Sequence, residues 1–125
     1  MKRDLELIRA ILLEVEELPI GQFLSSIEIE GHSDEVIAEH VRLLEEANFI
    51  EAQLAHGRSN FGALQVKAYA ITRLLNDGHD FIANAKNPTI WKKTTNFIQE
   101  RGGDVSLAVT KAVMAKEALQ LFGLN

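Results

Sequence analysis

Four histidines are the side chains best suited to acid–base or metal chemistry near neutral pH, and they are widely spaced along the 125-residue sequence: His32, His40, His56 and His79. They fall in different predicted elements, and none belongs to an H-E-x-x-H string, which would place two zinc ligands on one helix face. The chain has no cysteine, which excludes disulfides, thiolate metal sites and a cysteine nucleophile. We expect neither a metal site nor a cofactor.

One short string, Gly78-His79-Asp80, places a histidine beside a carboxylate at the start of a predicted helix. Such a pair could exchange protons with a substrate, but a histidine at a helix start more often bonds locally or packs. The sequence contains no Walker loop, no glycine fingerprint for dinucleotides and no G-x-S-x-G elbow. We therefore predict a protein that is not an enzyme.

The first elements that would position any site are a helix and a short strand. Asp4 can cap a helix whose apolar residues repeat every three or four positions until Pro19. The alternation Ile27-Glu28-Ile29-Glu30 predicts a brief strand, and residues 20–26 are compatible with one helical turn.

A central helix is predicted to start at the cap Ser33 and to end at Asn48, a residue that tolerates left-handed backbone geometry. Its buried stripe would contain Val36 or Ile37, His40 or Val41, Leu44 and Ala47. Strands from Phe49 to Leu54 and from Val66 to Thr72 should then form a hairpin around the turn formers of residues 56–62.

The last third predicts helices. Asn76 or Asp77 can cap one that runs to Ala85, Pro88 can begin another, and Ser106 can cap a third. The third is apolar around much of its circumference, which favours a neighbour from a second subunit; the candidates for this self-association are Leu107, Val113, Met114, Leu121 and Phe122. We predict a winged-helix core over residues 1–85 and a helical pair over residues 86–125, in one compact domain.

Charge is unevenly distributed along the chain, whose net charge is −5. Residues 1–85 hold seven Lys or Arg against fifteen Asp or Glu, a net −8, and residues 86–125 hold six against three, a net +3. The outward positions of the central helix would carry one arginine, Arg42, and the titratable His40 against five carboxylates: Asp34, Glu35, Glu39, Glu45 and Glu46. That sign is unfavourable for a helix that enters a DNA groove.

Two classes of macromolecular partner remain open. The candidates for binding a protein are Glu35, Glu39, Arg42 and Glu46, which could attract a basic surface. The candidates for binding duplex DNA are Arg42 on the helix and His56, Arg58, Asn60 and Lys67 in or beside the hairpin. A second possible nucleic-acid surface combines Trp91, which could stack on a base, with Lys86, Lys92, Lys93, Arg101, Lys111 and Lys116.

Several strings, taken in order, resemble a bacterial and phage family that is catalogued as domain of unknown function 2513. They are M-K-R-D-L-E-L-I-R-A-I-L-L-E-V-E-E at the start, I-E-I-E-G-H-S-D-E-V-I-A-E-H-V-R-L-L-E-E-A from Ile27, G-H-D-F-I from Gly78, and I-W-K-K-T from Ile90 with Gly102-Gly103. The chain has Leu75-Asn76 where relatives tend to have L-T. The resemblance implies a winged helix with added C-terminal helices and a phage or prophage setting, and no activity.

Together these observations predict an α+β, mostly helical protein: a winged helix-turn-helix with a C-terminal helical extension. With no membrane span or secretory signal in the sequence, we expect a cytoplasmic location. We predict a regulator that binds a protein, with sequence-specific DNA binding as the alternative.

Overall fold

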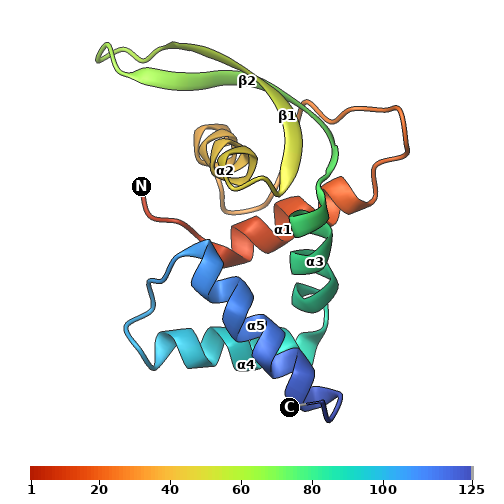
Figure 1. Ribbon diagram of the computed structural model, residues 1–125. Helices are drawn as coiled ribbons and strands as arrows, with labels where there is room; N and C mark the ends of the chain where they lie inside the picture. Colours follow the sequence, from red (N-terminus) through yellow and green to blue (C-terminus); the bar gives the residue numbers. More distant parts are fainter. Residues whose placement is uncertain (125) are drawn as a thin grey trace. The chain divides into compact units, whose positions relative to one another are not determined.

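The computed structural model describes residues 1–124, which form five helices and one two-stranded sheet (Figure 1). Their order is α1 (Leu5–Glu16), α2 (Asp34–Glu46), β1 (Ile50–Arg58), β2 (Leu64–Leu74), α3 (Asn76–Ala85), α4 (Pro88–Gln99) and α5 (Leu107–Leu121). The α+β class is confirmed, with about half of the chain in helices. The chain divides within α3 into two compact units: unit 1 spans Met1–His79, and unit 2 starts at Asp80.

Side-chain caps start the helices where the sequence predicts them. The Asp4 carboxylate accepts a hydrogen bond from the Leu7 N–H at 3.1 Å, and the Ser33 hydroxyl accepts one from the Val36 N–H at 3.2 Å. Each cap satisfies a backbone donor that has no partner inside the helix. Asn87, before Pro88, and Ser106 cap α4 and α5 in the same way.

The end of α2 leads directly into the hairpin. Asn48 has a φ of 61°, as predicted, and the Phe49 N–H donates to the Leu44 carbonyl at 3.0 Å. This left-handed residue reverses the chain after the last helical turn. Strand β1 therefore begins at Ile50 and returns over α2 (Figure 1).

The hairpin is longer than the sequence pattern predicts. The antiparallel register runs from Ile50↔Leu74 to Arg58↔Leu64, so His56, Gly57 and Arg58 belong to β1 and not to the turn. Two register shifts, between Glu51 and Ala52 and between Ala55 and His56, interrupt the pairing. Bulges of this kind increase the local twist and bend the strand.

The predicted strand at Ile27–Glu30 is wrong. The structure has only one isolated bridge in this region, between Leu24 and Ile71 of β2, and the segment then turns away from the sheet. The Ile27 N–H donates instead to the Tyr69 hydroxyl at 3.0 Å, and Ile27 is buried. Residues 17–33 contain no helix, so α1 and α2 are joined by a long loop.

The core of unit 1 lies where α1, α2 and the hairpin pack together. His40 is fully buried, so its assignment to the outer face of α2 is wrong and its place in the buried stripe is right. Its Nε2 accepts from the Asp4 N–H at 2.9 Å, and its Nδ1 lies 2.8 Å from the Val36 carbonyl. The ring is therefore neutral with the proton on Nδ1, because Nε2 must accept.

Unit 2 contains the end of α3 with α4 and α5, which pack against each other. Ile90, Trp91 and Ile98 of α4 are buried, and the Trp91 ring meets that of Phe81 edge to face with centroids 6.3 Å apart. Arg101 stacks on Phe97, with the guanidinium carbon 3.6 Å from the ring centroid.

The start of α3 explains a glycine inside a helix. The Phe49 carbonyl accepts from the Leu75 N–H at 2.9 Å, and α3 then begins at Asn76, which is thus the first helical residue and not the cap. A Cβ at Gly78 would lie 2.0 Å from the same Phe49 oxygen. Only glycine allows this close approach.

We expect Gly78→Ala to lower the free energy of unfolding by about 2 kcal/mol or more, because the methyl group would displace the backbone of Phe49. Helix propensity alone predicts the opposite sign, a gain of up to about 1 kcal/mol. Urea unfolding of both proteins measures the difference. Gly57→Ala is the comparison variant: its new methyl would lie 2.8 Å from the Lys67 Cγ, so a side chain and not a backbone carbonyl has to shift, and the loss should be smaller than for Gly78→Ala. A Gly78→Ala protein as stable as the parent would contradict the close approach.

Candidate partner-binding surfaces

The outer side of α2 carries five carboxylates, which we call the acidic face. Asp34, Glu35 and Glu46 are exposed, and the side chains of Glu39 and Glu45 are half-buried. The sequence therefore placed these side chains correctly at the surface of the helix. This face can attract cationic groups and repel phosphates.

Arg42 is held by the acidic face itself. Its Nε donates to Glu39 at 2.9 Å and its Nη1 donates to Glu46 at 3.1 Å. The hydrogen bond to Glu39, aided by the charges of Glu39 and Glu46 and opposed by partial burial, raises the pKa of Arg42 above its ordinary value. Because these groups are partly exposed, each ion pair contributes at most about 1 kcal/mol. Arg42 is therefore paired with carboxylates of its own helix.

The other nucleic-acid candidates gather on the hairpin, far along the strands from its junction with α2. His56, Arg58, Asn60 and Lys67 are all exposed. The Arg58 guanidinium donates to the Gly62 carbonyl at 3.0 Å, and the Lys67 ammonium donates to the Gln65 side chain at 3.2 Å. In the described structure neither Arg58 nor Lys67 contacts a carboxylate.

The sequence prediction missed how sharply charge divides within unit 1. Residues 1–51 hold four Lys or Arg against thirteen Asp or Glu, a net −9, whereas residues 52–76 hold three against none, a net +3. The hairpin tip also carries Phe61, which is 98% exposed, and Leu64, which is 66% exposed. The absence of carboxylates over 25 consecutive residues was readable from the sequence, but averaging over residues 1–85 concealed it.

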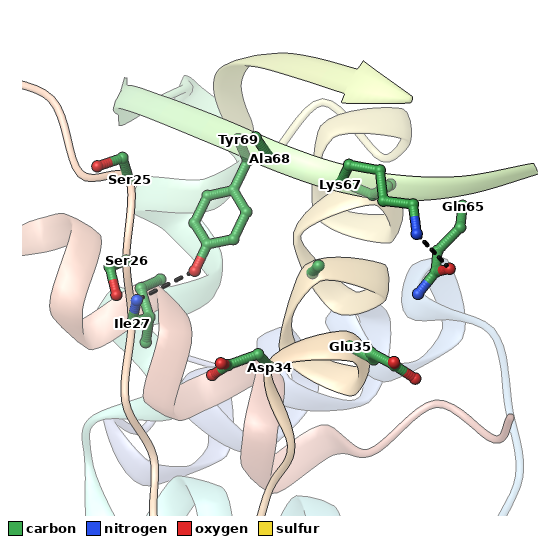
Figure 2. Close-up of a pocket in the computed structure, with 11 residues that line it drawn as sticks. Ser25, Ser26, Ile27, Asp34, Glu35, Gln65, Lys67, Ala68 and Tyr69 are labelled. Atoms are coloured by element: carbon green, nitrogen blue, oxygen red, sulfur yellow. Dashed lines mark hydrogen bonds between the residues drawn. The ribbon is translucent and has the colours of Figure 1, made fainter. Parts of the chain in front are cut away.

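A groove of about 360 Å³ lies between β2, the loop after Leu24 and the first turn of α2. Figure 2 shows Asp34 and Glu35 on the α2 side, and Lys67 with Gln65 on β2. Ser25 and Ser26 lie on the loop side. We call this the β2 groove; it holds two exposed carboxylates and one ammonium group.

Tyr69 closes one end of the β2 groove by reaching from β2 to the loop (Figure 2). Burial, with the nearby charge of Asp34, raises the pKa of its phenol above the ordinary value, although the hydrogen bond from the Ile27 N–H opposes the shift. The phenol therefore stays protonated and accepts this bond through the whole physiological range.

The histidines are not brought together. His40 is buried within the core, whereas His56 and His79 are exposed on separate elements. His32 lies 3.9 Å from the Asp4 carboxylate. Within residues 1–124, no three His, Asp or Glu side chains converge as a metal site requires.

The self-association candidates on α5 divide into two groups. Leu107 and Met114 are buried within this chain, and Val113 is half-buried. Leu121 and Phe122 are 44% and 70% exposed and remain candidates. The sequence pattern could not separate the side of α5 that packs on α4 from the free side, because both are apolar. Self-association stays a prediction.

Trp91 is not accessible on the second candidate nucleic-acid surface, that of the C-terminal helices. Trp91 is only 7% exposed and packs on Phe81, so it cannot stack on a base. The basic residues of this surface are exposed, apart from Lys111, which is half-buried. A tryptophan at helical spacing is here a core residue.

None of the helices described is both long and apolar enough to cross a membrane.

Tyr69 is the sole tyrosine of the chain, so its ionisation can be followed by ultraviolet absorbance. We expect a pKa above the ordinary value of about 10, and Asp34→Asn should move it back towards that value. Because the pKa is raised in the folded protein, the stabilisation that the protonated Tyr69 phenol contributes should be fully present below about pH 10. It should be lost as the pH rises through the folded pKa. An unshifted phenol in the parent protein would contradict the closed groove end.

The family model described as "Hypothetical protein (DUF2513)" matches residues 2–104. A protein of Haemophilus influenzae, described as an uncharacterized protein, is 29% identical over 121 residues, which cover 90% of this chain and 92% of that protein. No solved structure matches the chain. The family predicted from the ordered strings is confirmed, and this chain belongs to the DUF2513 family.

Proposed function

We propose that this protein is a non-catalytic regulator, of phage or prophage type, that works by binding another protein. The acidic face of α2 would receive a basic surface of that partner. The supporting observation is the state of Arg42, which is the one Lys or Arg residue of α2 and is neutralised by Glu39 and Glu46. The remaining carboxylates of the face therefore project a field that complements cations.

We further propose that unit 1 is a modified winged helix. Its element order supports this assignment, because α2 passes through Asn48 into a hairpin that returns over the helix (Figure 1). It departs from a helix-turn-helix, whose two helices are joined by a turn of three or four residues, because a loop joins α1 to α2. Winged helices bind proteins as well as DNA, so the fold alone does not determine which of the two is the ligand.

DNA binding through the hairpin is the second candidate function. The carboxylate-free segment 52–76 supports it, since Arg58 and Lys67 are available for phosphates and the exposed Phe61 resembles the apolar wedges of minor-groove binders. In this alternative the hairpin, and not α2, would contact the duplex.

If a protein is the ligand, Glu35→Lys should weaken its binding by about tenfold or more, because reversing one charge replaces attraction with repulsion. Affinity capture from a lysate of the source organism, with nuclease added, measures this. Glu30→Lys is the matched control, since Glu30 is also exposed but lies outside the groove and the acidic face.

The variant Arg42→Gln tests whether the carboxylates of α2 or its arginine bind the protein partner. Protein binding should be retained or become tighter, because the change frees Glu39 and Glu46 from their ion pairs. Loss of protein binding in this variant, or equal losses from Glu35→Lys and Glu30→Lys, would contradict the acidic face as the binding surface.

If DNA is the ligand, Arg58→Glu should abolish a gel shift, and the affinity of the parent should fall steeply with salt as counterions are released. Phe61→Ser should weaken binding without changing the salt slope, because it removes no charge. Glu35→Lys should leave the shift intact or strengthen it. Absence of any shift at low salt would remove the DNA alternative.

A further inference from the structure

Strand β2 has an outer edge that already pairs with a third segment at one position. The Leu24 N–H donates to the Ile71 carbonyl at 2.8 Å, and the Ile71 N–H donates to the Leu24 carbonyl at 2.9 Å. The loop then leaves β2, and the Ile27 N–H donates to the Tyr69 hydroxyl and not to a backbone carbonyl of β2. Strand pairing at this edge therefore begins and stops after one residue pair.

The rest of this edge faces the β2 groove. Pairing of β2 with β1 is uninterrupted from Ile71↔Ala52 to Ala68↔Ala55. Because backbone groups alternate in direction along an antiparallel strand, those of Tyr69 point away from β1 as those of Ile71 do. Among the residues described, the N–H and carbonyl of Tyr69 have no partner outside the hairpin. They form an open edge beside the groove.

The groove has the charge and polarity for a basic, extended ligand. Asp34 and Glu35 are exposed in the first turn of α2 and line it opposite β2. The Lys67 ammonium, which also lines the groove, is turned to the Gln65 side chain at 3.2 Å. An added strand presents alternate side chains to one face, so its cationic side chains could point to α2 while its backbone pairs with β2.

A second copy of β2 is a poorer occupant of the same edge. Two β2 edges paired antiparallel around Lys67 would bring two ammonium groups together. Lysines at sheet edges oppose such pairing between identical chains. A different segment, whose positive charges face Asp34 and Glu35, avoids this conflict.

We propose that the outer edge of β2 at Gln65–Tyr69 binds an extended, Lys- or Arg-bearing segment of a partner protein as an added β-strand, with its basic side chains facing Asp34 and Glu35. The proposal rests on the proposed function, because it specifies how a basic protein partner is held. Backbone pairing would provide much of the affinity, and the two carboxylates would select for positive charge.

The test uses an acetylated and amidated hexapeptide, Lys-Thr-Lys-Val-Lys-Thr, as the probe for the intact protein. We expect it to shift the amide resonances of Gln65–Tyr69 and to slow hydrogen exchange at the Tyr69 amide. The control peptide is N-methylated at every second residue, so that its charge is kept while donors on one edge are lost. It should bind at least about tenfold more weakly, the loss expected from one or two net hydrogen bonds.

A matched pair of protein variants tests the carboxylates. Asp34→Asn with Glu35→Gln should weaken peptide binding severalfold, whereas Glu28→Gln with Glu30→Gln should not. Both variants remove two exposed negative charges, and only the first changes the groove. Circular dichroism of both variants controls for the fold.

Three outcomes would overturn the added strand: no binding of the unmodified peptide, equal binding of both peptides, or equal losses in both double variants. A Tyr69 amide that is protected in concentrated protein and exposed on dilution would identify a second copy as the occupant, which also overturns it. Capture of a host protein that depends on Glu35, with no preference for the unmethylated peptide, would leave the proposed function standing alone. Peptide binding as described without a captured protein would refute the function and keep the site.

Discussion

The burial of one side of α2 decides what its opposite side presents. Ile37, Val41 and Leu44 are buried and lie within one narrow sector of the helix, which packs against α1 and the hairpin. At 100° per residue, the sector opposite to them falls on a single stripe spaced by three or four residues: Glu35, Glu39, Arg42 and Glu46. Any rotation that turned the carboxylates away from solvent would also expose these core residues. The charge of the surface is thus a consequence of core packing.

His40 fixes this rotation from inside the core. Its two ring nitrogens bond to backbone groups of different helices: Nε2 accepts from the Asp4 N–H, and Nδ1 donates to the Val36 carbonyl within α2. An apolar residue of similar size would fill the volume but would leave the Asp4 N–H without this acceptor. Since Asp4 is also the cap of α1, one side chain links the start of the first helix to the middle of the second.

The sequence predicted those features that are encoded within a few neighbouring residues. Caps at Asp4, Ser33 and Ser106, and the left-handed Asn48, each depend on local backbone chemistry, and each was found. The strand predicted at Ile27–Glu30 failed because its two apolar residues satisfy an alternation that the sheet does not use. The Ile27 N–H of this segment donates to the hydroxyl of Tyr69, which is 42 residues away in the sequence.

The site was harder to predict than the fold, because it depends on contacts between distant residues. That Arg42 is bound by Glu39 and Glu46 could be proposed from spacing, but that Asp34 and Glu35 face the edge of β2 could not. The close approach of Gly78 to the Phe49 carbonyl, and the burial of Leu107 and Met114, are likewise tertiary facts. In each case the local sequence was compatible with either interpretation. Only the tertiary packing determined which one holds.

The separation of charge within unit 1 has a consequence for how its two surfaces can act. Arg58 lies eight residues beyond Ile50, or roughly 26 Å along an extended strand, while Glu46 ends α2 just before Ile50. Salt at physiological concentration screens charges over about 8 Å, so the hairpin tip and the end of α2 exert largely independent fields. A cationic ligand near the C-terminal end of α2 and an anionic ligand at the tip would therefore not compete through charge alone. Lys67, in contrast, lines the same groove as Asp34 and Glu35. It is the residue through which binding at one surface would alter the electrostatics of the other.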